Sequence, residues 1–186
     1  KGRPSDHPLI VHVPGASAVP QFASEVPAFA RKLMQAFWPG PLTLILPRRA
    51  GVAAAAAAGQ SSIGLRCPAH PVAQALLAAC ALTTPPVTGL AAPSANKFGR
   101  VSPTMAAHVR AEFGDELLVL DGGACPVGIE SAIVDCTRGA PVLLRPGVLT
   151  RGQIEAACGQ PLRAPEELSG APRASGTLES HYAPNA

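Results

Sequence analysis

The sequence predicts an α/β domain built around one twisted β-sheet. Short apolar segments that are typical of strands alternate along the chain with longer segments of helical periodicity. Most of the apolar segments are continuous, which is typical of strands that are covered on both faces. The chain has 186 residues and 47% of them are hydrophobic, so one domain with a packed core can form.

The predicted strands are short and rich in Val, Ile and Leu, with Pro, Gly or polar residues at their ends. They cover residues 9–13, 42–46, 63–66, 87–92, 117–120, 131–135 and 142–144.

The predicted helices are recognised by their start and stop signals. An apolar face at helical spacing predicts a helix from residue 24 to the Pro-Gly-Pro sequence at 39–41. Pro71 begins the next helix, which reaches about residue 82. Ser102 followed by Pro103 predicts the N-cap of a helix that ends near residue 114. A capping box of Thr150 and Gln153 begins a helix over 151–158.

Composition and charge narrow the class of protein. The net charge of +3 is too small to indicate nucleic-acid binding. Five cysteines without a CxxC pair favour reduced thiols in a cytoplasmic protein over a zinc site or a disulfide framework. The apolar run at 52–58 is too short to cross a bilayer, and no signal segment opens the chain. We therefore expect a soluble protein.

The loop that follows the strand at 87–92 is unusually polar for this chain. It crowds Ser94, Asn96, Lys97, Arg100 and Ser102 into one turn, which fits either a solvated loop or a loop that binds a phosphate. The sequence contains no GxxxxGK[ST], no GxGxxG after a strand and no GxSxG, so standard nucleotide and hydrolase motifs do not explain it.

Cations also stand where the predicted strands begin or end, at the edges where open α/β sheets bind ligands. Besides the two loop cations, they are Lys1, Arg3, Arg66 and Arg145. If these side chains converge in the fold, they would form an anion site large enough for a triphosphate.

Several stretches, in this order, resemble the YrdC-like family of threonylcarbamoyl-AMP synthases over about residues 1–158. They read KGRPSDHPLIVHV, PGPLTLIL, IGLRCPAHPVAQALL, APSANKFGRVSPT, GIESAIVD and LLRPGVLT. ESHYAP at 179–184 resembles the linker of the longer, two-domain members. The family also has an upstream strand with a PTET-like turn, which this chain lacks, so we expect that an N-terminal part is missing.

The resemblance implies a mostly mixed sheet flanked by helices, with a concave, positively charged nucleotide site. Residues 1–160 would form the catalytic domain, and residues 161–186 a linker that closes as a lid toward a further domain. The implied reaction converts ATP, L-threonine and bicarbonate to threonylcarbamoyl-AMP and pyrophosphate, with Mg²⁺ bound to ATP. The product would supply a cytoplasmic transferase machinery that acts on tRNA, and weak contact with RNA is a further expectation.

The resemblance also assigns the site residues. Lys1 and Arg3 would be catalytic because they neutralise the triphosphate and the leaving pyrophosphate. The other ATP-binding residues would be Ser62, Ser94, Asn96, Ser102, Arg145 and His181. The threonine-binding residues would be His12, Arg66, Ala92 through its backbone, and Ser131, with Arg66 gripping the carboxylate.

Other interpretations stay open. The same domain could make carbamoyl adenylates inside a larger carbamoyltransferase, although the HYAP sequence favours the threonine-using branch. A non-enzymatic RNA-binding module is weaker because basic and aromatic residues are not interleaved. For single residues, His12 could be a satisfied core histidine, Ser102 only an N-cap, and Ser131 only a strand hydroxyl.

Overall fold

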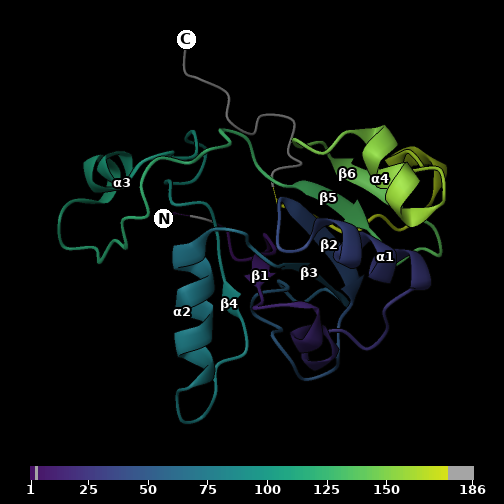
Figure 1. The fold of residues 1–186 in the computed structure, drawn as a ribbon, viewed down its shortest axis with the longest axis horizontal. Helices are drawn as coiled ribbons and strands as arrows, with labels where there is room; N and C mark the ends of the chain where they lie inside the picture. The colour runs from purple at the N-terminus through teal and green to yellow at the C-terminus, as the bar shows by residue number, and fades with distance from the viewer. Residues whose placement is uncertain (3, 176–186) are drawn as a thin grey trace.

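The apolar segments of the chain assemble into one six-stranded sheet with the strand order β4-β1-β3-β2-β5-β6 (Figure 1). The computed structural model describes residues 1–2 and 4–175. The β1–β3 and β2–β5 pairs are parallel, and the other neighbouring strands are antiparallel. The bounds are Ile10–His12 (β1), Leu42–Pro47 (β2), Ser62–Arg66 (β3), Leu90–Ala91 (β4), Ala132–Asp135 (β5) and Val142–Arg145 (β6). The predicted α/β class and mixed sheet are confirmed.

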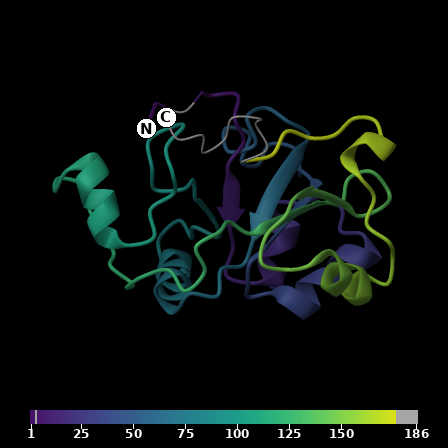
Figure 2. The same cartoon turned by 90° about the horizontal axis from the view of Figure 1, so that it is seen from above.

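Helices pack along one face of this sheet. Helix α1 (Ala28–Phe37) contacts α4 (Arg151–Cys158), and Figure 2 shows both on the same side of the strands. Helix α2 (Pro71–Ala81) stands beside the short edge strand β4, and α3 (Ala106–Phe113) lies farther out (Figure 1). Two 3₁₀ helices complete the described elements, at Ala16–Gln21 and Pro165–Glu167. The prediction of cover on both faces is therefore only partly correct, since these helices cover one.

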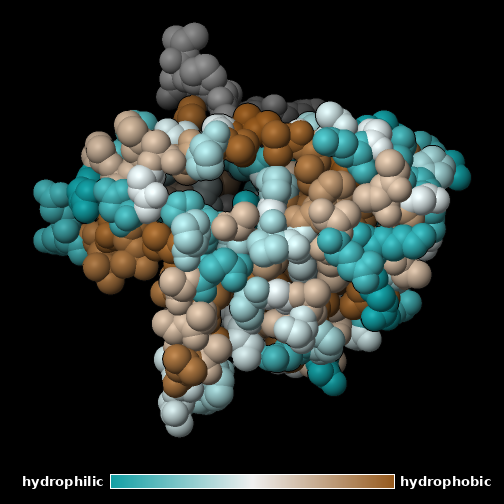
Figure 3. Space-filling model, viewed as in Figure 1, coloured by the Kyte–Doolittle hydropathy of each residue, from teal (hydrophilic) through white to brown (hydrophobic). Residues whose placement is uncertain are grey.

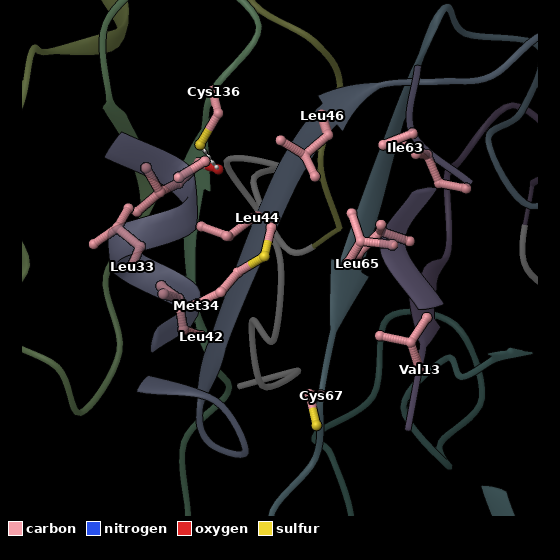
Figure 4. Close-up of a cluster of buried hydrophobic side chains, with 14 of the residues drawn as sticks. Val13, Leu33, Met34, Leu42, Leu44, Leu46, Ile63, Leu65, Cys67 and Cys136 are labelled. Carbon is pink, nitrogen blue, oxygen red and sulfur yellow. Dashed lines mark hydrogen bonds between the residues drawn. The ribbon is translucent and has the colours of Figure 1, made fainter. Parts of the chain in front are cut away.

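The main hydrophobic core lies between the sheet and helices α1 and α4. Successive side chains of a strand point to opposite faces, so every second residue of β2 and β3 enters this core. Leu44 and Leu65 are fully buried there and pack with Leu33 and Met34 of α1 (Figure 4). The residues between them point to the opposite face, which is where the polar side chains of the strands lie.

The helix predictions were correct in number but two began too early. Helix α1 begins at Ala28 after Pro27, not at residue 24. Helix α3 begins at Ala106 with Met105 in the cap position, so Ser102 is not its N-cap. The Ser102 hydroxyl instead donates a hydrogen bond to Glu130 Oε1 at 2.8 Å. The capping box of α4 is confirmed.

The segment between β4 and β5 departs most from the prediction. Residues 117–120 form a loop rather than a strand, and Leu118 is 87% exposed. No described strand lies beside them to supply the hydrogen bonds that a strand needs. The predicted strand 87–92 shortens to two residues, and α3 buries none of its residues. Figure 3 shows hydrophobic surface around this outer part of the molecule.

The chain after α4 returns to the sheet and covers part of its second face. Arg138 Nη1 donates to the carbonyl oxygens of Pro165 and Leu168, at 3.3 and 2.5 Å. Ala174 is buried against Ile45 and Ile133. Among the described residues, no helix is both long enough and apolar enough to span a membrane.

Candidate functional site

The second face of the sheet carries the polar residues of the central strands. Because their neighbours Val11, Leu44 and Leu65 point into the helix-covered core, His12, Thr43 and Arg66 point to the opposite face. A small cavity of about 20 Å³, which has room for about one water molecule and opens to solvent, lies on this face. It is bounded by the chain at 8–10 and 173–175 and by side chains and backbone of Thr43, Ile45, Gln60, Ser62, Gly64 and Ile133.

Two basic side chains lie side by side at one end of this face. His12 and Arg66 are register partners on the parallel strands β1 and β3. Burial, and then the charge of Arg66, lower the pKa of His12 to about 4, so the imidazole is neutral at pH 7. Burial, and then the positive charge of Arg145, lower the pKa of Arg66. Two guanidinium groups are thus held near each other in a partly desolvated place.

Arg66 has no acidic partner that would explain this arrangement. Its Nε donates to the Gly40 carbonyl oxygen at 3.1 Å, and it forms no ion pair with any described residue. A guanidinium held beside a second one is destabilised unless an anion approaches both. The geometry therefore suits a carboxylate or phosphate ligand.

Arg145 connects the sheet to the returning chain. Its Nε and Nη2 donate to the Ser131 carbonyl oxygen at 3.0 and 2.9 Å, and its Nη1 donates to the Ser175 carbonyl oxygen at 2.9 Å. The buried Ser131 hydroxyl lies 2.8 Å from Thr43 Oγ1 and 3.3 Å from Arg145 Nη2. Three predicted site residues, Arg66, Ser131 and Arg145, are thus brought together.

Thr43 belongs to this group but was not predicted. It is completely buried, shares a hydrogen bond with Ser131 and pairs with Arg66 across β2 and β3. The one signal in the sequence is a single hydroxyl within the otherwise apolar strand LTLIL. A buried hydroxyl needs a hydrogen-bond partner, and Ser131 is that partner for Thr43.

A second group forms where the N-terminal residues meet the polar loop. Lys1 Nζ donates to the carbonyl oxygens of Ser94 and Asn96, and the Phe98 amide donates to the Lys1 carbonyl oxygen at 2.9 Å. The Asn96 side chain is buried, and its Nδ2 donates to the carbonyl oxygens of Lys97 and Arg100 at 2.8 and 2.7 Å. Asn96 therefore holds the shape of the loop, and Lys1 lies against it.

The remaining predicted residues are placed less centrally. Ser62 is nearly buried and borders the cavity, and the Ala92 amide donates to the Ile10 carbonyl oxygen at 2.9 Å beyond the end of β4. Lys97 and Arg100 are exposed, and Arg100 lies 3.8 Å from Glu112. Arg3 and His181 lie outside the described residues. Among the predicted site cations that the structure describes, Arg66 and Arg145 lie together, Lys1 lies against the polar loop, and Lys97 and Arg100 stay on the surface.

Comparisons with known proteins identify the family of the chain. The family profile described as "Telomere recombination" (Sua5/YciO/YrdC) matches residues 1–147. Two proteins named threonylcarbamoyl-AMP synthase, from Bacillus subtilis and Pyrococcus abyssi, are 41% and 40% identical over the whole of this chain. The chain covers 53% and 54% of their lengths, so it spans about half of the curated relatives that it matches.

Solved structures give the same assignment. The structure of P. abyssi Sua5 complexed with L-threonine superimposes with a TM-score of 0.86 at 38% identity, over 100% of this chain and 54% of that chain. Escherichia coli YciO, at 22% identity, covers 81% of this chain and 71% of its own with a TM-score of 0.67, and it shows the shared fold. By profile, sequence and structure, the chain belongs to the Sua5/YciO/YrdC family.

Proposed function

We propose that this chain carries the catalytic domain of a threonylcarbamoyl-AMP synthase. The observation that carries the proposal is the half-buried Arg66, which lies beside Arg145 and has no carboxylate partner among the described residues. An amino-acid carboxylate would supply the missing negative charge. The names of the relatives and the threonine complex of P. abyssi Sua5 support the choice of L-threonine.

The proposed reaction joins three substrates. The amino group of threonine and bicarbonate form a carbamate with loss of water, and a carbamate oxygen attacks the α-phosphorus of ATP. A new phosphorus–oxygen bond forms, and the bond to pyrophosphate breaks. Threonylcarbamoyl-AMP and pyrophosphate are the products.

Each group of the site has a task in this scheme. Arg66 binds the threonine carboxylate, and neutral His12 and Ser131 complete the amino-acid pocket with hydrogen bonds. Lys1, together with the loop that holds Ser94 and Asn96, lies against the triphosphate. Arg145 neutralises charge that develops on the phosphates, because a fixed cation in a dry site stabilises a developing anion strongly. Ser62 and Ser102 are proposed to donate to the nucleotide.

Mg²⁺ would enter as the complex with ATP. Within residues 1–2 and 4–175, no group of three or more His, Cys, Asp or Glu residues could hold a metal ion. The phosphate oxygens of ATP are donors that Mg²⁺ prefers, and the ion would neutralise part of the triphosphate charge. The protein side chains supply the cations around it.

The experiment measures pyrophosphate release by the full-length protein with each substrate omitted in turn. We expect release only when ATP, L-threonine and bicarbonate are all present, with threonylcarbamoyl-AMP identified by mass spectrometry. Equally fast release with carbamoyl phosphate in place of threonine and bicarbonate would assign the domain to a carbamoyltransferase instead. Saturable ATP binding with little dependence on salt would separate both enzymes from an RNA-binding module, whose affinity falls steeply with salt.

A further inference from the structure

Thr43 places a hydroxyl group inside one of the most deeply buried strands of the sheet. Its side chain is completely buried, as are those of its neighbours Leu42 and Leu44. Burying a hydroxyl costs free energy unless it makes hydrogen bonds, and a valine would fill the same space with apolar atoms and suit a strand equally well. Packing alone therefore does not explain a threonine at this position.

The two branches of the Thr43 side chain point toward different neighbouring strands. The methyl carbon Cγ2 faces β3, at 3.6 Å from the position that a Cβ on Gly64 would take. The hydroxyl oxygen Oγ1 faces the start of β5, at 2.8 Å from the Ser131 hydroxyl oxygen. Because a β-branched side chain has few χ1 rotamers, this packing fixes the direction of the hydroxyl. Within residues 1–2 and 4–175, Ser131 is the one hydrogen-bond partner of Thr43 Oγ1.

The direction of this hydrogen bond follows from the donors and acceptors around it. If Ser131 donated, the Thr43 hydrogen would be buried without an acceptor among the described residues, which is costly. If Thr43 donates instead, its hydrogen is satisfied, and the Ser131 oxygen accepts both from Thr43 and, at 3.3 Å, from Arg145 Nη2. A hydroxyl oxygen has two lone pairs, so the Ser131 hydroxyl can then act toward a ligand only as a donor.

We infer that Thr43 is a positioning residue, which makes the Ser131 hydroxyl a hydrogen-bond donor to the amino-acid substrate. The inference rests on the proposed function and deepens it. Arg66 is the register partner of Thr43 on β3, and Arg145 contacts Ser131 from β6. A hydroxyl donor placed with two guanidinium groups suits a carboxylate, whose oxygens accept several hydrogen bonds at once. Thr43 acts through Ser131 and does not touch the substrate itself.

The test compares two variants of the full-length protein: Thr43→Val, which keeps the shape and removes the hydroxyl, and Thr43→Ser, which keeps the hydroxyl. Calorimetry should show that L-threonine binds about tenfold more weakly to Thr43→Val, the scale for losing one hydrogen bond to a charged group. ATP affinity should stay unchanged. Thr43→Ser should restore threonine affinity, because the serine hydroxyl can still donate to Ser131.

A double-mutant cycle shows whether the effect passes through Ser131. In a Ser131→Ala background, Thr43→Val should cause no further loss of threonine affinity, because the hydroxyl that Thr43 directs is gone. The matched control is Thr137→Val, which removes a hydroxyl that donates to Asp135 Oδ1 at 2.7 Å, beyond the other end of β5. It should leave threonine affinity unchanged, whatever its effect on the melting temperature.

Four outcomes would contradict the inference alone. They are unchanged threonine affinity in Thr43→Val, equal losses for threonine and ATP, no recovery in Thr43→Ser, and a full further loss in the Ser131→Ala background. A Thr43→Val protein that melts far below the wild type would also count against it, because the hydroxyl would then serve the stability of the sheet. A wild-type protein that does not bind L-threonine would instead overturn the proposed function.

Discussion

The two faces of the same sheet do different work. On the face covered by α1 and α4, the strands present fully buried aliphatic side chains such as Leu44 and Leu65. On the other face the same strands present Thr43, Gly64 and Arg66, next to a cavity and a returning segment of chain. Residues one position apart therefore differ completely in their role, because a strand alternates its side chains between faces.

This difference teaches that stability and ligand binding can be separated within one strand. Leu65 and Arg66 are neighbours in sequence, but Leu65 contributes buried apolar area, and Arg66 contributes a charge that has no acidic partner among the described residues. Substitutions on β3 should consequently fall into two classes, one that unfolds the domain and one that empties the site.

The largest expected effect is on the core face. Leu65→Ala should lower the free energy of unfolding by about 2–5 kcal/mol, because it removes buried methyl groups and leaves a cavity. Urea unfolding of the full-length protein measures it. A loss below about 1 kcal/mol would show that the core collapses around the gap, and the contrast between the faces would weaken.

The next effect is on the site face. Arg66→Ala should weaken threonine binding by roughly 2–4 kcal/mol, the range for losing one partner of a buried charged pair, with little change in ATP affinity. Stability should change little, since repulsion from Arg145 is relieved as the bond to Gly40 is lost. Calorimetry with both ligands tests this, with Arg31→Ala, at an exposed position of α1, as the control. Lost ATP binding with intact threonine binding would assign Arg66 to the other ligand.

A smaller effect concerns His12 on the site face, whose protonation makes the stability of the domain depend on pH. His12 has a pKa of about 4 in the folded protein against an ordinary value of 6.5. The unfolded chain therefore binds the proton more readily, and stability that is present above pH 6.5 is lost as the pH falls toward 4. The loss amounts to at most roughly 3 kcal/mol.

Urea unfolding between pH 7 and pH 4 measures this contribution. His12→Gln should show a shallower loss of stability over the same range, because the variant has no imidazole to protonate. Parallel pH profiles for the two proteins would mean that His12 is protonated as easily in the folded state as in the unfolded state.

The central strands could be predicted from the sequence, whereas the outer segment could not. Residues 42–46, 63–66 and 131–135 were placed within a residue or so of β2, β3 and β5, because continuous apolar runs are fully buried there. The run at 117–120 has the same local composition, yet it forms no strand, since a strand also needs a neighbour with free hydrogen-bonding groups.

The site could be predicted only in part for a related reason. Motifs in the sequence identified Arg66, Ser131 and Arg145. These three residues come close to one another only because of the order of β3, β2, β5 and β6 in the sheet, which no local pattern encodes. Thr43 was missed because its role follows from a hydrogen bond across that order. The ligand-binding roles assigned to all of these residues, and to Arg3 and His181, remain predictions.

The side chain of Gln60 binds the segment 173–175, which forms one side of the cavity. Its Oε1 accepts from the Arg173 amide at 2.9 Å, and its Nε2 donates to the Arg173 carbonyl oxygen at 3.3 Å. The side-chain amide thus makes the pair of hydrogen bonds that the backbone of a neighbouring strand would make. Arg173 also reaches Asp6 at 3.1 Å. Residues 173–175, which border the cavity, are thus held by these polar contacts together with the burial of Ala174 against Ile45 and Ile133. All six strands lie before residue 146, whereas one side of the pocket comes from residues 173–175, so the sheet and the pocket are encoded by different lengths of the chain.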